Sequence, residues 1–134
     1  MKAVLDTNVL VAALRSKLGA SNEVLRRAFL GDFEVVLSLP LYLEYADVLG
    51  RSGMVPLSSE EAVQFRQDIA SVAVPYEIHF LWRPLLVDSK DDLVLELAVA
   101  SRSRYIVTHN VGHFRPAIAF NVKAIRPSEF LTLL

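Results

Sequence analysis

Two patterns of apolar residues alternate along the chain. Short apolar runs bounded by polar residues are typical of strands buried on both faces of a parallel sheet. The predicted strands are residues 1–5, 34–39, 76–80, 105–108 and 122–125. Between them lie stretches whose apolar residues recur every three or four positions, as on one face of a helix. The predicted helices are residues 8–14, 21–29, 40–49, 58–72, 91–102 and 127–134.

Local signals support several of these helices. Ser21 and Ser58 are each followed by glutamate, as in a capping pattern, and Pro40 suits the first turn of a helix. Gly31 and Gly50 are typical helix ends. Because strands alternate with helices, the sequence predicts an α/β fold, a three-layer α/β/α sandwich around a central, mainly parallel sheet. No linker or repeat interrupts it, so we expect residues 1–134 to form a single domain.

The composition narrows the available chemistry. Of the 134 residues, 53% are apolar, which is sufficient for a sizeable core. The chain has no cysteine, which excludes disulfides, thiolate metal sites and thiol nucleophiles. No apolar run is long enough to span a membrane and no signal-peptide pattern opens the chain, so we expect a cytoplasmic protein. The net charge is −1, yet ten of the fourteen cationic residues are arginine, which suits phosphate.

Acidic residues at strand ends are the first candidates for chemistry. In open parallel sheets the functional crevice lies at the carboxyl ends of the strands. Asp6 directly follows the first predicted strand and precedes Asn8. Its alternative role is the N-cap of the next helix, but its position favours a functional one.

A second acid lies on a predicted helix. Glu44 shares a helix side with Leu41 and Val48, which should face the core. Its alternative is an edge position whose side chain reaches solvent, and the pattern favours neither. Asp47 precedes Arg51 by four residues and is better explained as half of a surface ion pair.

Two adjacent aspartates, Asp91 and Asp92, open a later helix. Acidic residues favour the first turn of any helix, and this accounts for both. Neighbouring residues point about 100° apart, however. Asp91 aligns with the apolar stripe and is expected to face the sheet, whereas Asp92 aligns with Glu96 and Ser103 on a polar stripe expected to face water.

Polar residues follow the fourth predicted strand. Thr108 and Asn110 come at its end, and His113 follows three residues later. Asn110 offers a neutral oxygen, although asparagine is also a common turn former. The three histidines, His79, His109 and His113, lack a spacing that pairs two of them, so zinc is less favoured than a hard cation.

The three acids suggest a metal. Asp6, Glu44 and Asp91, brought together at one sheet edge, would repel one another unless a divalent cation neutralised them. Oxygen ligands favour Mg²⁺ or Mn²⁺, ions that stabilise the transition state of phosphodiester hydrolysis. Metal-dependent hydrolysis of a phosphodiester is therefore the leading chemistry.

A set of motifs resembles a known family. They are Val4-Leu5-Asp6-Thr7-Asn8-Val9, Leu43-Glu44-Tyr45, Asp91-Asp92 before an alanine-rich helix, and Ile106-Val107-Thr108-His109-Asn110. In this order the chain resembles the PIN-domain family, especially the ribonuclease toxins of type II toxin–antitoxin pairs. The resemblance implies an α/β/α fold, an acidic Mg²⁺ or Mn²⁺ site, endonucleolytic RNA cleavage, homodimerisation and inhibition by a cognate antitoxin.

The resemblance also implies roles for individual residues. Asp6, Glu44 and Asp91 match the three core acids, which implies metal binding and catalysis, and Asn8 and Thr108 match accompanying polar residues. Family members often carry a fourth aspartate at the position of Asn110 or of His113. Its loss should weaken binding of a second cation, so a one-metal mechanism or a weak nuclease stays open.

The working hypothesis is a ribonuclease with one Mg²⁺ or Mn²⁺ ion, in which Asn110 or His113 orients water or substrate and Asp92 supports the site. Residues expected at an RNA-binding rim are Arg15, Lys17, Arg51 and Arg115. For each of them taken singly, ordinary solvation is the more common explanation of an exposed cation. The helices near Ser21 and Ser58 carry apolar residues that suit a dimer or antitoxin interface.

Three rival functions are weaker. A non-catalytic PIN-like module that binds RNA or a partner protein is the alternative, because the fourth acid is missing. A phosphatase of the haloacid-dehalogenase type needs a second aspartate where Asn8 stands. Nucleotide-binding folds are excluded because the five glycines form neither a GxxxxGK[ST] loop nor a GxGxxG turn.

Overall fold

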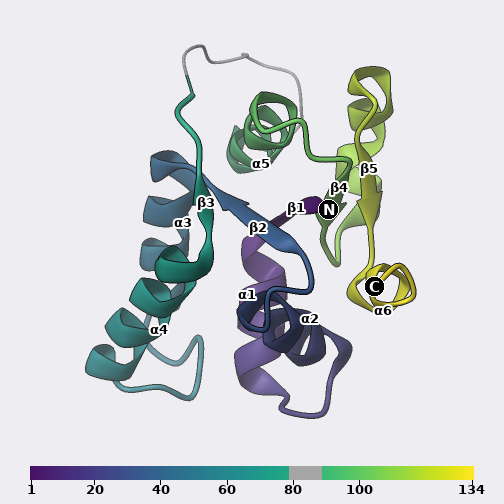
Figure 1. Cartoon of the computed structure of the whole chain (residues 1–134). Coiled ribbons are helices and arrows are strands. Elements are labelled where there is room, and N and C mark those ends of the chain that lie inside the picture. The colour runs from purple at the N-terminus through teal and green to yellow at the C-terminus, as the bar shows by residue number, and fades with distance from the viewer. Residues whose placement is uncertain (79–88) are drawn as a thin grey trace.

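The computed structural model describes residues 1–78 and 89–134 (Figure 1). A five-stranded sheet in the order β3-β2-β1-β4-β5 lies at its centre, and every pair of neighbouring strands is parallel. The strands are β1 (Lys2–Leu5), β2 (Glu34–Leu37), β3 (Val74–Pro75), β4 (Tyr105–Val107) and β5 (Lys123–Ile125). Because all strands run the same way, their carboxyl ends meet at one edge.

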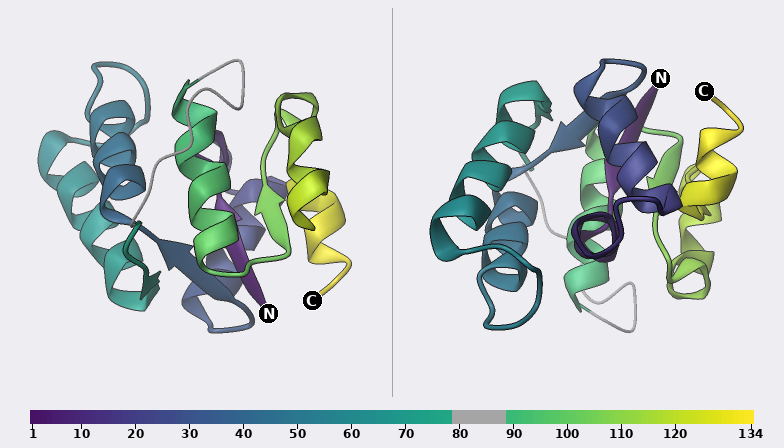
Figure 2. Two further views of the ribbon diagram at one scale, coloured as in Figure 1. Left: turned by 90° about the horizontal axis from the view of Figure 1, so that it is seen from above. Right: turned by 90° about the horizontal axis from the view of Figure 1, so that it is seen from below.

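Helices cover both faces of this sheet. They are α1 (Thr7–Arg15), α2 (Ala20–Phe29), α3 (Leu39–Leu49), α4 (Ser59–Val72), α5 (Ser89–Ala100), the 3₁₀ segment η1 (Val111–Phe120) and α6 (Pro127–Leu131). Helices α1 and α2 lie on one face and α5 lies on the other, as Figures 1 and 2 show from different sides. The predicted three-layer α/β/α sandwich is therefore confirmed, and its sheet is wholly parallel.

The central strand β1 explains why the apolar runs are continuous. Ala3, Val4 and Leu5 are almost fully buried, since α1 and α2 cover one side and α5 the other. A strand covered on both faces has no solvent side on which polar residues are favoured. The polar residue that follows, Asp6, therefore marks the end of the strand.

Several predicted elements differ from the observed ones. The third strand is Val74–Pro75 instead of 76–80, and residues 79 and 80 lie outside the described part of the chain. Pro75 is tolerated because β3 is an edge strand. Helix α2 begins at Ala20 after Gly19, so Ser21 is not its cap. The η1 segment between β4 and β5 was not predicted, since Pro116 and Gly112 interrupt the helical pattern.

The capping pattern at Ser58 is confirmed and allows a stability test. Its hydroxyl accepts a hydrogen bond from Glu61 N, and the Glu61 carboxylate accepts one from Ser58 N. We expect Ser58→Ala to lower the free energy of unfolding by about 1 kcal/mol, since α4 loses its cap. Urea denaturation measures this. Ser59→Ala, one residue further on, is the control, and an equal loss there would contradict the assignment of the cap.

Within residues 1–78 and 89–134, no helix combines the length and apolar character that crossing a bilayer requires.

Candidate functional site

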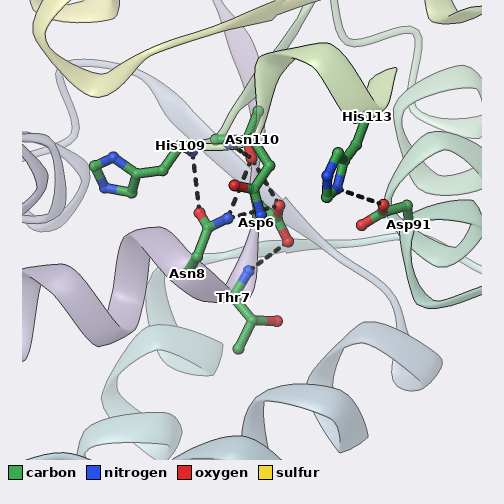
Figure 3. A network of polar contacts seen from close by, with 8 residues as sticks. Asp6, Thr7, Asn8, Asp91, His109, Asn110 and His113 are labelled. Atoms are coloured by element: carbon green, nitrogen blue, oxygen red, sulfur yellow. Dashed lines mark hydrogen bonds and ion pairs between the residues drawn. The ribbon is translucent and has the colours of Figure 1, made fainter. Parts of the chain in front are cut away.

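Asp6 is the centre of a hydrogen-bonded group at the carboxyl end of β1 (Figure 3). Its Oδ1 accepts a hydrogen bond from Thr7 N at 2.8 Å, which caps α1. Its Oδ2 accepts from Thr108 Oγ1 at 2.7 Å and from Asn8 Nδ2 at 3.3 Å. The side chain is thus the N-cap of α1, as one of the two alternatives predicted, and it also lines the candidate site.

Thr108 and Asn8 join the ends of β1 and β4. Asn8 Nδ2 also lies 3.3 Å from Thr108 Oγ1, and Asn8 Oδ1 accepts from His109 N at 3.2 Å. Thr108 Oγ1 accepts from Asn110 N at 3.0 Å, so the loop after β4 is tied to the same group. These contacts fix the orientation of the Asp6 carboxylate, because three donors from two segments hold its two oxygens.

The other two predicted acids face the same space. Asp6, Glu44, Asp91 and Asn110 line one polar hollow of about 130 Å³. Glu44 comes from α3 and Asp91 from the first turn of α5, whereas Asp6 precedes α1. The three carboxylates therefore come from three different helices or helix ends. The structure therefore brings together the residues that the sequence singled out from distant positions.

Each of these two acids has a basic neighbour. Lys90 Nζ lies 3.7 Å from Glu44 Oε1, and His113 Nδ1 lies 3.4 Å from Asp91 Oδ2. Figure 3 shows His113 reaching from η1 toward Asp91 on α5. The predicted proximity of His113 to the acids is thus seen, and Lys90 is a site residue that sequence reasoning missed.

The donor set fits a hard divalent cation. Three carboxylates and two amides line the hollow, and their oxygen atoms are the ligands that Mg²⁺ and Mn²⁺ prefer. As the side chains lie, no three histidine, aspartate or glutamate groups in the described residues are close enough to hold one ion together. Binding to all three acids therefore requires Glu44 and Asp91 to exchange Lys90 and His113 for the ion.

Tyr45 supports the site from beneath. Its hydroxyl donates a hydrogen bond to the carbonyl oxygen of Leu5, the residue before Asp6. Burial, and to a lesser extent the negative charge of Asp6, raises the pKa of the Tyr45 hydroxyl well above its usual value. The hydroxyl therefore stays protonated, and it anchors α3 to the end of β1 as a constant donor.

His109 faces away from the carboxylates. Its Nε2 lies 2.8 Å from the buried Ser21 Oγ on α2, and Figure 3 shows the ring pointing away from Asp6. This contact was not predicted, because Ser21 had been interpreted as a helix cap. Among the candidate histidines, His113 is thus directed to the acids, His109 is directed to α2, and His79 lies outside the described residues.

The expectation that Asp92 faces water was wrong. Asp92 is 1% exposed, and Glu96 and Ser103 on the same stripe are also buried. The physical reason is that α5 packs against β1 and β4, against η1 and against α3, so more than one side of it is covered. A polar stripe indicates a solvated face only when a single side of a helix is packed.

The four predicted rim residues lie in different places. Arg15 ends α1, about 12 Å along the axis from the site, and donates to Met54 O. Arg51 pairs with Asp47 at 2.9 Å, as predicted, just beyond the end of α3. Lys17 follows the end of α1 and is exposed. Arg115 lies on η1, two residues after His113, and of the four it is nearest to the site along the chain.

The fold and the hollow define a parallel α/β domain with a carboxylate site at the sheet edge. The family model of the PIN domain matches residues 2–112. The chain therefore belongs to the PIN-domain family, as its motifs suggested.

Solved structures agree with this assignment at the level of fold. VapBC2 from Rickettsia felis, bound to a DNA fragment from the promoter, contains a chain with a TM-score of 0.66 and 18% identity, covering 94% of this chain and 98% of that one. FitAB bound to the IR36 DNA fragment gives a TM-score of 0.58 and 18% identity, with coverages of 93% and 94%. A search of the curated proteins gives no match.

Proposed function

We propose that the protein is a Mg²⁺- or Mn²⁺-dependent endoribonuclease. The observation that carries this proposal is the convergence of Asp6, Glu44 and Asp91 on one polar hollow at the carboxyl edge of a PIN-family sheet. PIN domains are generally nucleases and usually use divalent metal ions. Catalysis is assigned to Asp6, Glu44, Asp91 and Asn110, with Asn8, Asp92, Thr108 and His113 in support.

The residues of the chain have distinct roles in this proposal. Asp6, Glu44 and Asp91 would hold the ion, which when bound supplies stabilisation of charge on the phosphate oxygens. Thr108 and Asn8 keep the Asp6 carboxylate in one orientation through their hydrogen bonds. Asn110 lines the hollow with a neutral amide and is suited to orienting water or a phosphate oxygen.

We also propose that the protein is the toxin of a toxin–antitoxin pair and acts in the cytoplasm. Chains of similar fold occur in the VapBC2 and FitAB complexes, which supports an antitoxin protein as partner. Apolar side chains left exposed on α2 and α4, such as Phe29, Val63 and Val72, suit an antitoxin or a homodimer interface.

The alternative is a PIN module that binds RNA or a partner protein without cleaving RNA. Asn110 and His113 stand where a fourth acid is common in the family, and His113 contacts Asp91. A basic neighbour in place of an acid would weaken metal binding.

Cleavage of a mixed RNA pool tests the proposal. With purified protein, we expect fragments of the pool RNA in Mg²⁺ or Mn²⁺ and none in EDTA, because the carboxylates act through the bound ion. Calorimetric titration with Mn²⁺ separates the two functions. No cleavage and no Mn²⁺ binding, together with tight RNA or protein binding, would support the module and overturn the nuclease.

A further inference from the structure

The charges of this chain are unevenly distributed. Residues 97–128 contain no aspartate or glutamate, although the whole chain has 15 acidic residues and 14 lysines and arginines. The cations of this segment are Arg102, Arg104, Arg115, Lys123 and Arg126. All five are exposed, and they come from the α5–β4 connection, η1, β5 and the residue that follows β5.

These cations are available to a ligand. Among the ion pairs between described residues none involves any of them, whereas Arg26, Arg27 and Arg51 elsewhere are each paired with a nearby acid. Arg126 donates a hydrogen bond to His109 O at 3.3 Å, which brings this cation beside the loop after β4. The segment therefore presents uncompensated positive charge.

A second hollow lies among these charges, between η1 and the edge strand β5. Its volume is about 190 Å³, and we refer to it as the basic hollow. Phe114, Ile118 and Val122 give it an apolar lining, and Arg115 and Lys123 also line it. Ile118 is 79% exposed, so an apolar surface is open to solvent next to two cations.

The basic hollow adjoins the acidic hollow along the chain. Asn110 lines the acidic one and Val111, the next residue, lines the basic one. Consecutive Cα atoms are about 3.8 Å apart. An RNA strand held along η1 would therefore lead toward the carboxylates of the acidic hollow, which lies where η1 begins.

We propose that the basic hollow binds single-stranded RNA next to the scissile position, with a base against the apolar lining and phosphates at Arg115 and Lys123. Charge complementarity supports this occupant, since an apolar surface between unpaired cations matches a base between phosphates. A single strand fits better than a duplex, because a duplex keeps the flat faces of its bases stacked inside. This inference rests on the proposed function and adds where the substrate is held.

Binding in the absence of metal tests this inference separately from cleavage. The probe is a fluorescein-labelled, unstructured RNA 12-mer in EDTA, and the readout is fluorescence anisotropy at several salt concentrations. We expect Arg115→Glu/Lys123→Glu to weaken binding more than tenfold near 0.1 M salt. Loss of two phosphate contacts should also lower the slope of log affinity against log salt by about 1.4. Ile118→Ser, at an exposed position, should weaken binding about threefold while leaving the salt slope unchanged.

The matched control is Arg26→Glu/Arg27→Glu, which makes the same charge change on α2, at two arginines that are each paired with a nearby acid. We expect it to bind within about twofold of wild type, since non-specific charge effects at this salt are screened over about 10 Å. Equal losses in the two double variants, or equal binding of a 12-bp DNA duplex by wild type, would overturn the inference. RNA binding by wild type that the Arg115→Glu/Lys123→Glu variant weakens, without cleavage by wild type in Mg²⁺ or Mn²⁺, would contradict the nuclease and leave the RNA site supported.

Discussion

Replacing Asp6 by asparagine is expected to reduce metal-dependent RNA cleavage by more than about 100-fold. Loss of a residue that only orients a metal ligand typically lowers activity by about 10- to 100-fold, so a larger loss indicates a ligand. Asparagine has the same shape but no charge, so the hollow loses one of three anionic groups. The fold should survive, because an asparagine at this N-cap still accepts the hydrogen bond from Thr7 N. The loss would therefore report on chemistry instead of on stability.

Asp47→Asn is the control for this variant. Asp47 is exposed on α3, three residues after Glu44, and its removal changes the net charge by the same amount. Initial rates on the RNA pool with saturating Mn²⁺, together with thermal unfolding of each variant, give the comparison. We expect Asp47→Asn to cleave within about twofold of wild type, as surface ion pairs contribute little. Undiminished cleavage by Asp6→Asn would remove Asp6 from the mechanism.

Much of the site follows from simple rules applied to the sequence. A polar residue directly after an apolar run marks a strand end, and parallel strands end at one edge, so Asp6 and Thr108 are expected at the same edge. The pairing of β1 with β4 makes them neighbours. Their hydroxyl–carboxylate distance of 2.7 Å agrees with this. Helical register placed Asp91 toward the sheet, and the structure lines the hollow with it.

Other features were not predictable from local patterns. Burial of Asp92 depends on how many neighbours α5 has, and that number is a property of the whole fold. No local pattern singles out Lys90, yet the packing of α3 against α5 brings it to Glu44. A 3₁₀ segment such as η1 has a weak sequence signal, and its position opposite α5 became evident only with the fold.

Replacing His113 by aspartate is expected to raise the affinity for Mn²⁺ about tenfold or more. His113 Nδ1 lies 3.4 Å from Asp91 Oδ2. An imidazole carries no negative charge, so it contributes no anionic ligand to the site. An aspartate there cannot form that contact, and it adds an oxygen ligand with a charge, on which the affinity of such sites depends. Calorimetry with Mn²⁺ measures the change, and cleavage at limiting Mn²⁺ should rise with it.

Gly112→Asp is the matched control for this substitution, because it adds the same charge one residue away. A Cβ at Gly112 meets no atom within 4 Å, so the variant should fold normally. A general increase in negative charge would raise Mn²⁺ affinity equally in both variants, whereas a ligand at position 113 would raise it only in His113→Asp. If neither variant binds Mn²⁺ more tightly than wild type, position 113 on η1 does not face the ion. Weak Mn²⁺ binding by wild type would then not result from the missing fourth acid.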